Sequence, residues 1–274
     1  MRRLVNIFAE FFSSIWKEKG KIFQLAKNDM KSRYAGSFLG IFWAYFIPLV
    51  SILVYWFVFE KGLKATPPAS ANVPFLAWFM AGLVPWFYFS EAWMSSTNVL
   101  LDYNYLVKQM VFDVRILPFV RVISALFVHL VFMAIMLVVL ALYGILPSIR
   151  VGPLLYYMLC LICLIISVSI ISSVIMPFFR DMTQVINVIT TMGFWMTPIA
   201  WDYTNMNIPV VFQYILKLNP MFYVVQGYRD ALVSDTFAWQ GASITLYFWI
   251  LVGALFAVGV LAYHRMRMHL ADVI

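Results

Sequence analysis

Long apolar stretches separated by more polar connections set the organisation of this 274-residue chain. Six of them reach or approach the roughly 18–20 residues that a hydrocarbon core requires, and they run over residues 38–59, 75–97, 116–143, 152–177, 183–200 and 243–263. Backbone N–H and C=O groups in lipid must be satisfied within their own segment, which favours helices over strands. The pattern predicts an all-α polytopic membrane protein with six transmembrane helices, in a transmembrane domain over residues 38–263.

Residues 1–37 have a different pattern, in which apolar positions recur at helical spacing beside a basic polar face. The apolar positions are Leu4, Phe8, Phe11, Phe12 and Ile15 in one stripe and Ile22, Phe23, Ala26, Met30 and Tyr34 in a second. Basic amphipathic helices of this kind lie in the membrane interface with their apolar side down. A plain positively charged flank would need no stripe, so we expect a cytoplasmic amphipathic interface segment.

Residues 98–115 form a connection that is long for a simple turn. Asp102, Lys108, Asp113 and Arg115 alternate in charge along an otherwise apolar segment. We expect a short, exposed amphipathic helix there, suited to docking a soluble partner.

The stretch over 201–241 contains two further apolar runs, 208–218 and 221–233, each too short to cross a bilayer. Asn219-Pro220 lies between them and favours a chain break. Runs of this length form re-entrant or interfacial helices, and irregular backbone is tolerated where protein or a water-filled path surrounds it. We expect a short re-entrant hairpin on the outer side, between spans five and six.

The composition indicates that lipid is the solvent for most of this surface. Hydrophobic residues make up 64% of the chain and charged residues 11%, whereas soluble domains have roughly 45–50% and about 25%. The net charge of +7 reflects topology rather than nucleic-acid binding, because most of the 19 basic residues fall on the side of the two termini. Both termini, including the tail over 264–274, are therefore expected to be cytoplasmic.

Catalytic and metal-binding patterns are absent from the sequence. No G-x-x-x-x-G-K-[ST] phosphate loop, H-E-x-x-H or G-x-S-x-G motif occurs. Cys160 and Cys163 lie in an apolar run without further metal ligands, so we expect two small, lipid-buried residues. His129, within a span, is expected to be packed or bonded between helices.

Ionisable groups within the predicted spans are few. Glu91 and Arg121 both fall in the cytoplasmic half of their spans, and we expect them to pair. A proton- or sodium-driven carrier usually needs carboxylates at mid-depth. An external energy source therefore fits this chain better.

Short motifs follow one another in a fixed order along this background. They are Arg33-Tyr34, Leu39-Gly40, Trp43 and Pro48 at span one, Pro85-Trp86-Phe87 in span two, Lys108 and Arg115-Ile116-Leu117-Pro118 after it, Phe179-Arg180-Asp181 after span four, Trp195-Met196-Thr197-Pro198 closing span five, and Asn219-Pro220 with Arg229 in the outer hairpin. Over nearly its whole length the chain resembles the permease subunit of type-2 ABC exporters of lipid-linked polysaccharide, such as O-antigen, teichoic acid and capsule.

The resemblance implies a homodimer in a bacterial cytoplasmic (inner) membrane, paired with two copies of a separate cytoplasmic ABC ATPase. The chain itself would then be no enzyme and hold no cofactor, with ATP and magnesium bound by the partner. The segment over 98–110 would be a coupling helix that enters the ATPase, and the coupling residues would be Asp102, Tyr105, Lys108, Arg115, Arg180 and Asp181. The residues of the outer gate would be Pro198, Asn219, Pro220 and Arg229.

The resemblance also implies a channel for an undecaprenyl-linked glycan at the dimer interface, lined by spans one and five. Sugar rings present C–H faces that pack on aromatic planes, and such stacking tolerates variation in the polymer. The candidate lining aromatics are Trp43, Tyr45, Phe46, Phe194, Trp195, Trp201 and Tyr203. Aromatic residues also form interfacial belts in membrane proteins, so either role is open for each of them.

Three alternatives remain for the function. One is a type-2 ABC permease that exports a small drug, antibiotic or lipid. Another is a membrane-embedded enzyme acting on polyprenyl lipids, whose acidic candidates would be Asp202, Asp230 and Asp235. The third is a structural scaffold, which would explain neither the hairpin nor the coupling segment.

Overall fold

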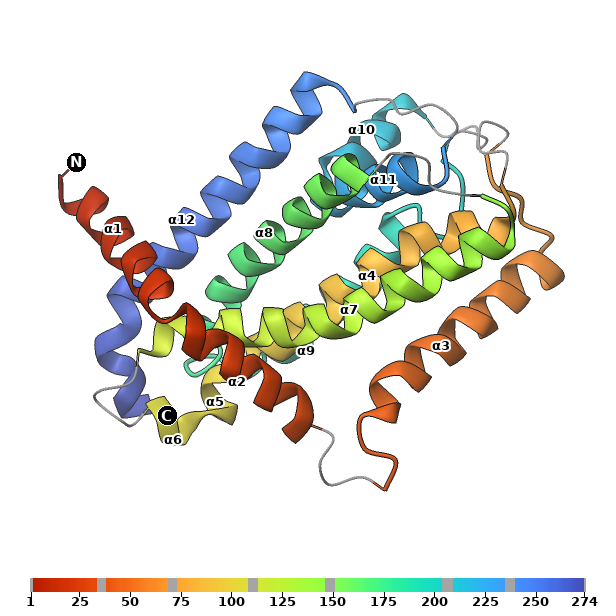
Figure 1. The fold of residues 1–274 in the computed structure, drawn as a ribbon. Helices are drawn as coiled ribbons and strands as arrows, with labels where there is room; N and C mark the ends of the chain where they lie inside the picture. Colours follow the sequence, from red (N-terminus) through yellow and green to blue (C-terminus); the bar gives the residue numbers. More distant parts are fainter. Residues whose placement is uncertain are drawn as a thin grey trace.

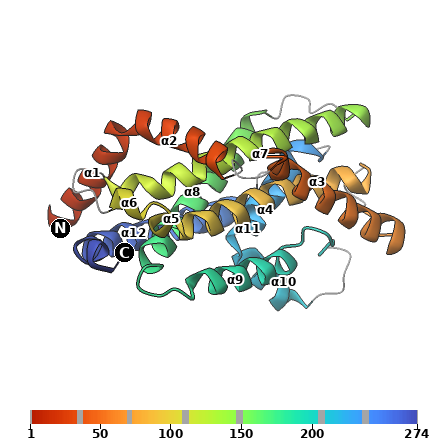
Figure 2. The ribbon, with the colours of Figure 1, turned by 90° about the horizontal axis from the view of Figure 1, so that it is seen from below.

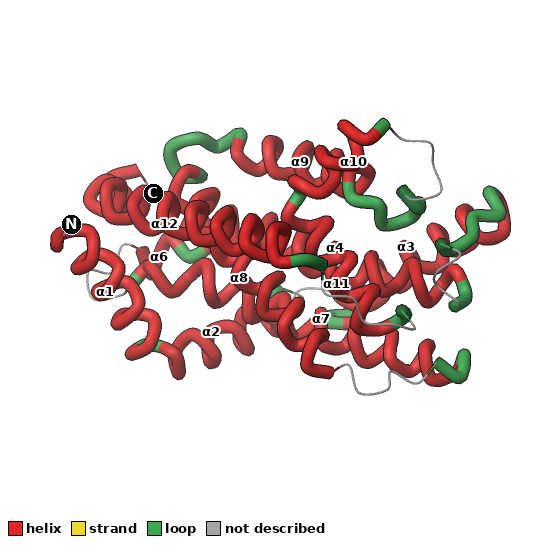
Figure 3. The backbone as a smooth tube through the Cα atoms, turned by 90° about the horizontal axis from the view of Figure 1, so that it is seen from above, coloured by secondary structure: helices red, strands yellow, loops and turns green. Residues whose placement is uncertain are grey.

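The computed structural model describes residues 2–33, 38–68, 73–107, 113–145, 151–203, 209–234 and 240–273. Within these ranges every regular element is helical and no strand occurs, as the tube in Figure 3 shows. The all-helical prediction is therefore confirmed for the described part of the chain.

The long helices of the bundle run roughly alongside one another (Figure 1). They are α3 (Phe42–Trp56, continued by the π-helical turn η1, Phe57–Gly62), α4 (Phe75–Thr97), α7 (Leu117–Leu142), α8 (Val151–Ile175), α9 (Met182–Met196) and α12 (Ala242–Val273). Helix α4 lies at the centre, where it packs against α3, α7, α8, α9 and α11. The core of the molecule therefore surrounds α4.

Four helical segments of the described chain are long and apolar enough to cross a membrane, namely Phe42–Gly62, Val114–Leu142, Val151–Ile175 and Ala242–Met266. The predicted count of six is not confirmed. Helix α4 has 23 residues and is mostly buried, but it is less apolar because it carries Trp, Tyr and Ser side chains and the exposed Glu91. Helix α9 has 15 residues, a length of about 22 Å against the ~30 Å of a hydrocarbon core.

Two helices near the N-terminus, α1 (Arg2–Lys17) and α2 (Lys19–Ser32), cross the direction of the bundle (Figure 1). Phe11 of α1 packs against Ile170 of α8 and Val260 of α12. Ile22 and Ala26 of α2 pack on the start of α7. One side of each helix is thus buried against the bundle, and their placement in the membrane interface remains a prediction.

The connection after α4 contains two single-turn helices, α5 (Val99–Asp102) and α6 (Asn104–Val107), in place of one amphipathic helix. The backbone leaves the helical conformation at Tyr103, and Val99 and Leu100 are buried against Leu117 at the start of α7. The 3-10 turn η2 (Val114–Ile116) then leads into α7. Both short helices lie at the same end of the bundle as α2 (Figure 1).

At the opposite end lie α10 (Val210–Leu218) and α11 (Pro220–Leu232). The predicted break at Asn219-Pro220 is confirmed, since the Asn219 side chain caps α11 by accepting from the Met221 N–H at 3.0 Å. Helix α11 is buried among α4, α8 and α12, whereas α10 packs against α11 and is largely exposed (Figure 2). The re-entrant placement of the pair in the outer leaflet remains a prediction.

Candidate functional site

A cavity of about 400 Å³ lies between α2, α3, α4, α7 and α9. Its volume falls in the roughly 300–1,000 Å³ range of ordinary ligand pockets. The wall is mostly apolar, with polar groups from α9 and, at the end near α2, charged ones. The lining residues include Trp43, Ile47 and Pro48 of α3, Phe87, Tyr88, Ser90 and Glu91 of α4, Ser124, His129 and Phe132 of α7, Asn187 and Thr190 of α9, and Arg33.

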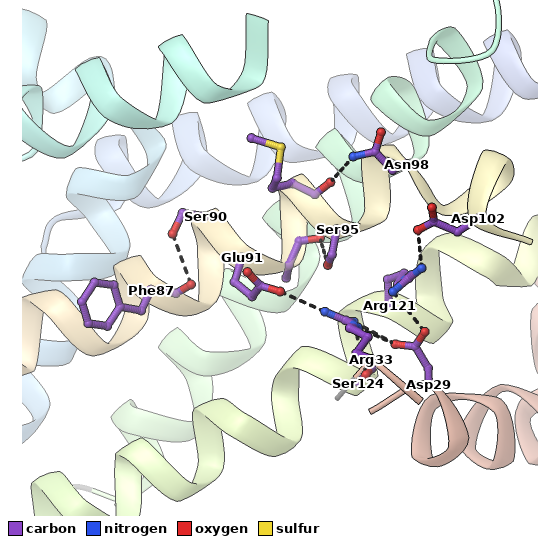
Figure 4. Close-up of polar contacts among 12 residues, drawn as sticks. Asp29, Arg33, Phe87, Ser90, Glu91, Ser95, Asn98, Asp102, Arg121 and Ser124 are labelled. Atoms are coloured by element: carbon purple, nitrogen blue, oxygen red, sulfur yellow. Dashed lines mark hydrogen bonds and ion pairs between the residues drawn. The ribbon is translucent and has the colours of Figure 1, made fainter. Parts of the chain in front are cut away.

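Charged side chains from four segments meet at this end of the cavity (Figure 4). Asp29 of α2 accepts from Arg33 Nη2 at 2.8 Å, from Tyr103 Oη at 2.8 Å and from Arg121 Nη1 at 3.1 Å. Arg33 also donates through Nη1 to Glu91 Oε1 at 2.9 Å. The group links α2 to α4, to α7 and to the turn after α5.

The charge state of Asp29 follows from its surroundings. Burial alone would raise the pKa of this carboxyl group, because the charged form loses water. Arg33 and Arg121 outweigh burial and, with a hydrogen bond from Ser124, hold the pKa of Asp29 below its ordinary value of 3.8. Asp29 is therefore an ionised carboxylate at neutral pH, although only 2% of it is exposed.

The predicted pairing of Glu91 with Arg121 is wrong. Arg121 bonds to Asp29 and to Asp102, while Glu91 bonds to Arg33. The reason is that α2 lies against α7 and places Asp29 beside Arg121, an arrangement that the predicted spans alone do not indicate.

His129 is bonded between helices, as predicted. Its Nε2 lies 3.2 Å from the hydroxyl of Tyr228 on α11, and its ring stacks on Tyr88 of α4 with centroids 4.7 Å apart. The two cysteines are free thiols, but protein rather than lipid surrounds Cys160, which is buried in the core, and Cys163 packs partly against that core.

The predicted lining aromatics occupy three environments. Trp43 lines the cavity and packs edge-on against Phe46, with ring centroids 5.7 Å apart. Tyr45 packs on Phe132, and Phe194 stacks on Tyr55, so both are partly buried in the core. Outside the core, Trp201 Nε1 donates to the Trp195 carbonyl at 3.1 Å, and Tyr203 packs against Phe222.

The predicted coupling residues are dispersed. Asp102 joins the charged group through Arg121, and Tyr105 is exposed. Arg115 pairs with Asp113, while Lys108 lies outside the described residues. Arg180 and Asp181 are exposed on the turn before α9, well apart along the chain from the rest of the set.

The predicted gate residues lie together. Arg229 of α11 is buried and donates through Nη1 to the Pro198 carbonyl at 2.7 Å and through Nη2 to the Ile199 carbonyl at 2.6 Å. Asn219 donates through Nδ2 to Thr197 Oγ1 at 2.8 Å, one residue before Pro198. Pro220 opens α11 directly after its capping residue. The structure thus brings all four predicted residues to one junction, where α11 meets the chain that leaves α9.

Asp29 is the residue of this site that sequence reasoning missed. A signal existed, because Ile22, Ala26, Asp29 and Arg33 follow the i, i+4, i+7, i+11 spacing of one helix face. A carboxylate on the buried face of an amphipathic helix requires a partner. The interface prediction considered only the apolar stripe and the basic face.

Comparison with known proteins places this geometry in a family. The model of the ABC-2 type transporter family matches residues 20–233. This chain belongs to the ABC-2 type transporter family. Such permeases are transporters, and the family implies an ABC ATPase as partner.

Individual relatives of this ABC-2 permease carry a more specific name. The O-antigen export system permease protein RfbA of Klebsiella pneumoniae is 27% identical over 254 residues, 91% of this chain and 93% of the relative. The protein of the same name from Myxococcus xanthus is 26% identical and covers 78% of this chain and 81% of itself. The similarity therefore extends over most of the ABC-2 permease and of both relatives.

Proposed function

We propose that this ABC-2 permease is the transmembrane subunit of an ATP-driven exporter that moves undecaprenyl-linked polysaccharide across the bacterial cytoplasmic membrane. The observation that carries the proposal is the similarity to permeases named for O-antigen export, which spans 91% of this chain in the Klebsiella pneumoniae relative. O-antigen, teichoic acid and capsule are the polymers that this proposal covers.

The proposed assembly is a homodimer with two copies of a cytoplasmic ABC ATPase, which would bind ATP and magnesium. Helices α3 and α9 support such a dimer, because each exposes large apolar side chains along much of its length. Residues of both helices also line the cavity, so a second copy facing them would enclose a longer path. In the proposed topology both termini and the α5–α6 segment face the cytoplasm, and the α10–α11 pair faces the outer side.

The wall of the cavity suits a saccharide. Trp43, Phe87 and Phe132 offer aromatic surfaces, and Asn187 and Thr190 offer hydrogen-bonding groups. Aromatic planes bind the C–H faces of sugars, while amide and hydroxyl groups bind their hydroxyls. A path for a purely apolar drug would not need this polar fraction.

Deletion and complementation test the proposal. A strain that lacks this gene should accumulate lipid-linked glycan inside the cell and lose it from the surface, and the plasmid-borne gene should restore export. The chain should also co-purify with an ABC ATPase, and a partner without its phosphate-loop lysine should fail to support export. Normal surface glycan combined with increased drug sensitivity would favour a small-molecule exporter instead.

A further inference from the structure

Arg121 connects two segments that are remote from each other in the sequence. It projects from α7 and bonds through Nη1 to Asp29 of α2 and through Nη2 to Asp102, the last residue of α5 (Figure 4). The arginine side chain is 8% exposed and Asp29 is 2% exposed, whereas Asp102 is 48% exposed. The buried guanidinium group of Arg121 thus has one carboxylate partner inside the molecule and one at its surface.

We propose that Arg121 is a positioning residue for energy coupling, which transmits a displacement of the α5–α6 segment to α2 and onward to the cavity. The inference rests on the proposed function, since only an exporter driven by an external ATPase needs such transmission. Neither the family membership nor the similarity to O-antigen permeases assigns a role to Arg121 or to Asp29.

The first part of this connection, from Asp102 through Arg121 to Asp29, is rigid. A guanidinium is a planar fork that holds two carboxylates in a fixed geometry, and separating the buried Arg121–Asp29 pair is strongly unfavourable. The segment is also bonded to α2 a second time, because Tyr103, next to Asp102, donates its hydroxyl to Asp29 at 2.8 Å. A movement of α5 is therefore passed to Asp29 rather than absorbed by a broken contact.

The second part of the connection, from Asp29 through Arg33 to Glu91, reaches the cavity. Asp29 holds Arg33 through Nε at 3.0 Å and Nη2 at 2.8 Å, which orients the remaining Nη1 toward Glu91. Glu91 is 57% exposed, and both Arg33 and Glu91 line the cavity wall. The bonded series Asp102, Arg121, Asp29, Arg33, Glu91 therefore runs without interruption from the α5–α6 segment to the cavity.

The outermost link offers the cleanest test. Asp102→Asn weakens the bond to Arg121, yet Arg121 keeps Asp29 as partner, so no buried charge is left unpaired. Asp102→Glu keeps the carboxylate. Arg121→Lys keeps the charge but lacks the fork that holds both carboxylates. Lys21→Gln is the matched control, because Lys21 is an exposed cation of α2 that pairs with Glu18 at the surface.

Each variant is co-expressed with the partner ATPase in a strain without the native gene. Export is measured as glycan at the cell surface, and hydrolysis as phosphate release by the purified complex. We expect Asp102→Asn and Arg121→Lys to keep complex yield and hydrolysis while export falls about tenfold, within the usual range of coupling free energies. Asp102→Glu should recover most of the export, and Lys21→Gln should match the wild type.

Two results would overturn the inference. One is wild-type export by Asp102→Asn. The other is a parallel loss of yield, hydrolysis and export that Asp102→Glu does not recover, which indicates a purely structural contact. A failure of the proposed function is recognised separately, because the wild-type chain would then bind no ATPase or export no glycan.

Discussion

The guanidinium of Arg229 lies over the indole of Trp78, with its carbon 3.6 Å from the ring centroid. Arg229 belongs to α11 and Trp78 to α4, and the arginine also binds the carbonyls of Pro198 and Ile199. Gly82 leaves the space for this contact, since a Cβ there would lie 2.9 Å from Arg229 Nη2. One buried cation thus joins the outer helix, the central helix and the chain after α9.

Replacing Arg229 should destabilise this junction. Arg229→Gln removes the cation–π contact and leaves two buried carbonyls without their donor, and each unsatisfied group costs about 1–3 kcal/mol. We expect a loss of about 2 kcal/mol or more, measured as a lower midpoint of thermal unfolding in detergent. Lys217→Gln, a change at a partly exposed cation of α10, is the control and should leave the midpoint in place. An unchanged midpoint for Arg229→Gln would contradict the bonding of Arg229 to the Pro198 and Ile199 carbonyls.

A close helix contact supplies a second prediction. A Cβ at Gly227 of α11 would lie 2.1 Å from the ring of Tyr157 on α8. Gly227→Ala should therefore overpack this interface at a cost of about 1–3 kcal/mol or more. The double variant Gly227→Ala/Tyr157→Leu should be more stable than the sum of the two single effects predicts.

Gly253→Ala is the matched control for this contact. Gly253 lies in α12, and a Cβ there would meet no atom within 4 Å. Alanine should be neutral at this position or stabilise the helix by up to about 1 kcal/mol. Equal unfolding midpoints for the two alanine variants would show that α8 and α11 are not so close.

Apolar runs in the sequence predicted the long helices, and the Asn219-Pro220 pair predicted the break between α10 and α11. Both signals are local, because each depends on neighbouring residues in the chain. They did not distinguish α10 from α11, two apolar runs of similar length. Their difference comes from remote partners, since Tyr228 bonds to His129 and Arg229 bonds to chain before α10. A local sequence pattern therefore cannot predict which of two apolar helices is buried against other helices.

The charged group shows the same limit. The sequence predicts the same depth for Glu91 and Arg121, and both side chains do belong to one charged group, linked through Arg33 and Asp29 (Figure 4). Their actual partners depend on how α2 crosses α7, which brings Asp29 between Arg33 and Arg121. How α2 packs on the bundle depends on tertiary structure. The Glu91–Arg121 pair, predicted from depth in the membrane alone, was therefore wrong.

The lowered pKa of Asp29 predicts a defined pH dependence. A carboxyl group whose folded pKa lies below its unfolded value stabilises the fold above the unfolded value, here close to 3.8, and loses that contribution as pH falls through the lower folded pKa. At pH 7, Asp29→Asn should cost about 3–5 kcal/mol, as expected when one partner of a buried ion pair is removed. The difference in unfolding midpoint between wild type and Asp29→Asn should shrink below pH 3.8. A difference that stayed constant down to pH 3 would show that folding does not lower the pKa of Asp29.

Trp43 provides a prediction for the cavity itself. Among the aromatic residues predicted to line the path, it contributes to the cavity wall, whereas Tyr45 and Phe194 pack into the core. If a glycan stacks on this indole, Trp43→Ala removes a contact of about 0.5–1.5 kcal/mol, which corresponds to a roughly two- to tenfold loss of export. Trp43→Phe keeps an aromatic plane and should retain more export than alanine. Tyr143→Ala, at an exposed ring of the turn after α7, is the control for loss of an aromatic group. Complex yield should be equal for all three variants. If Trp43→Ala loses export and Trp43→Phe does not recover it, the path requires the bulk of the tryptophan side chain rather than an aromatic face.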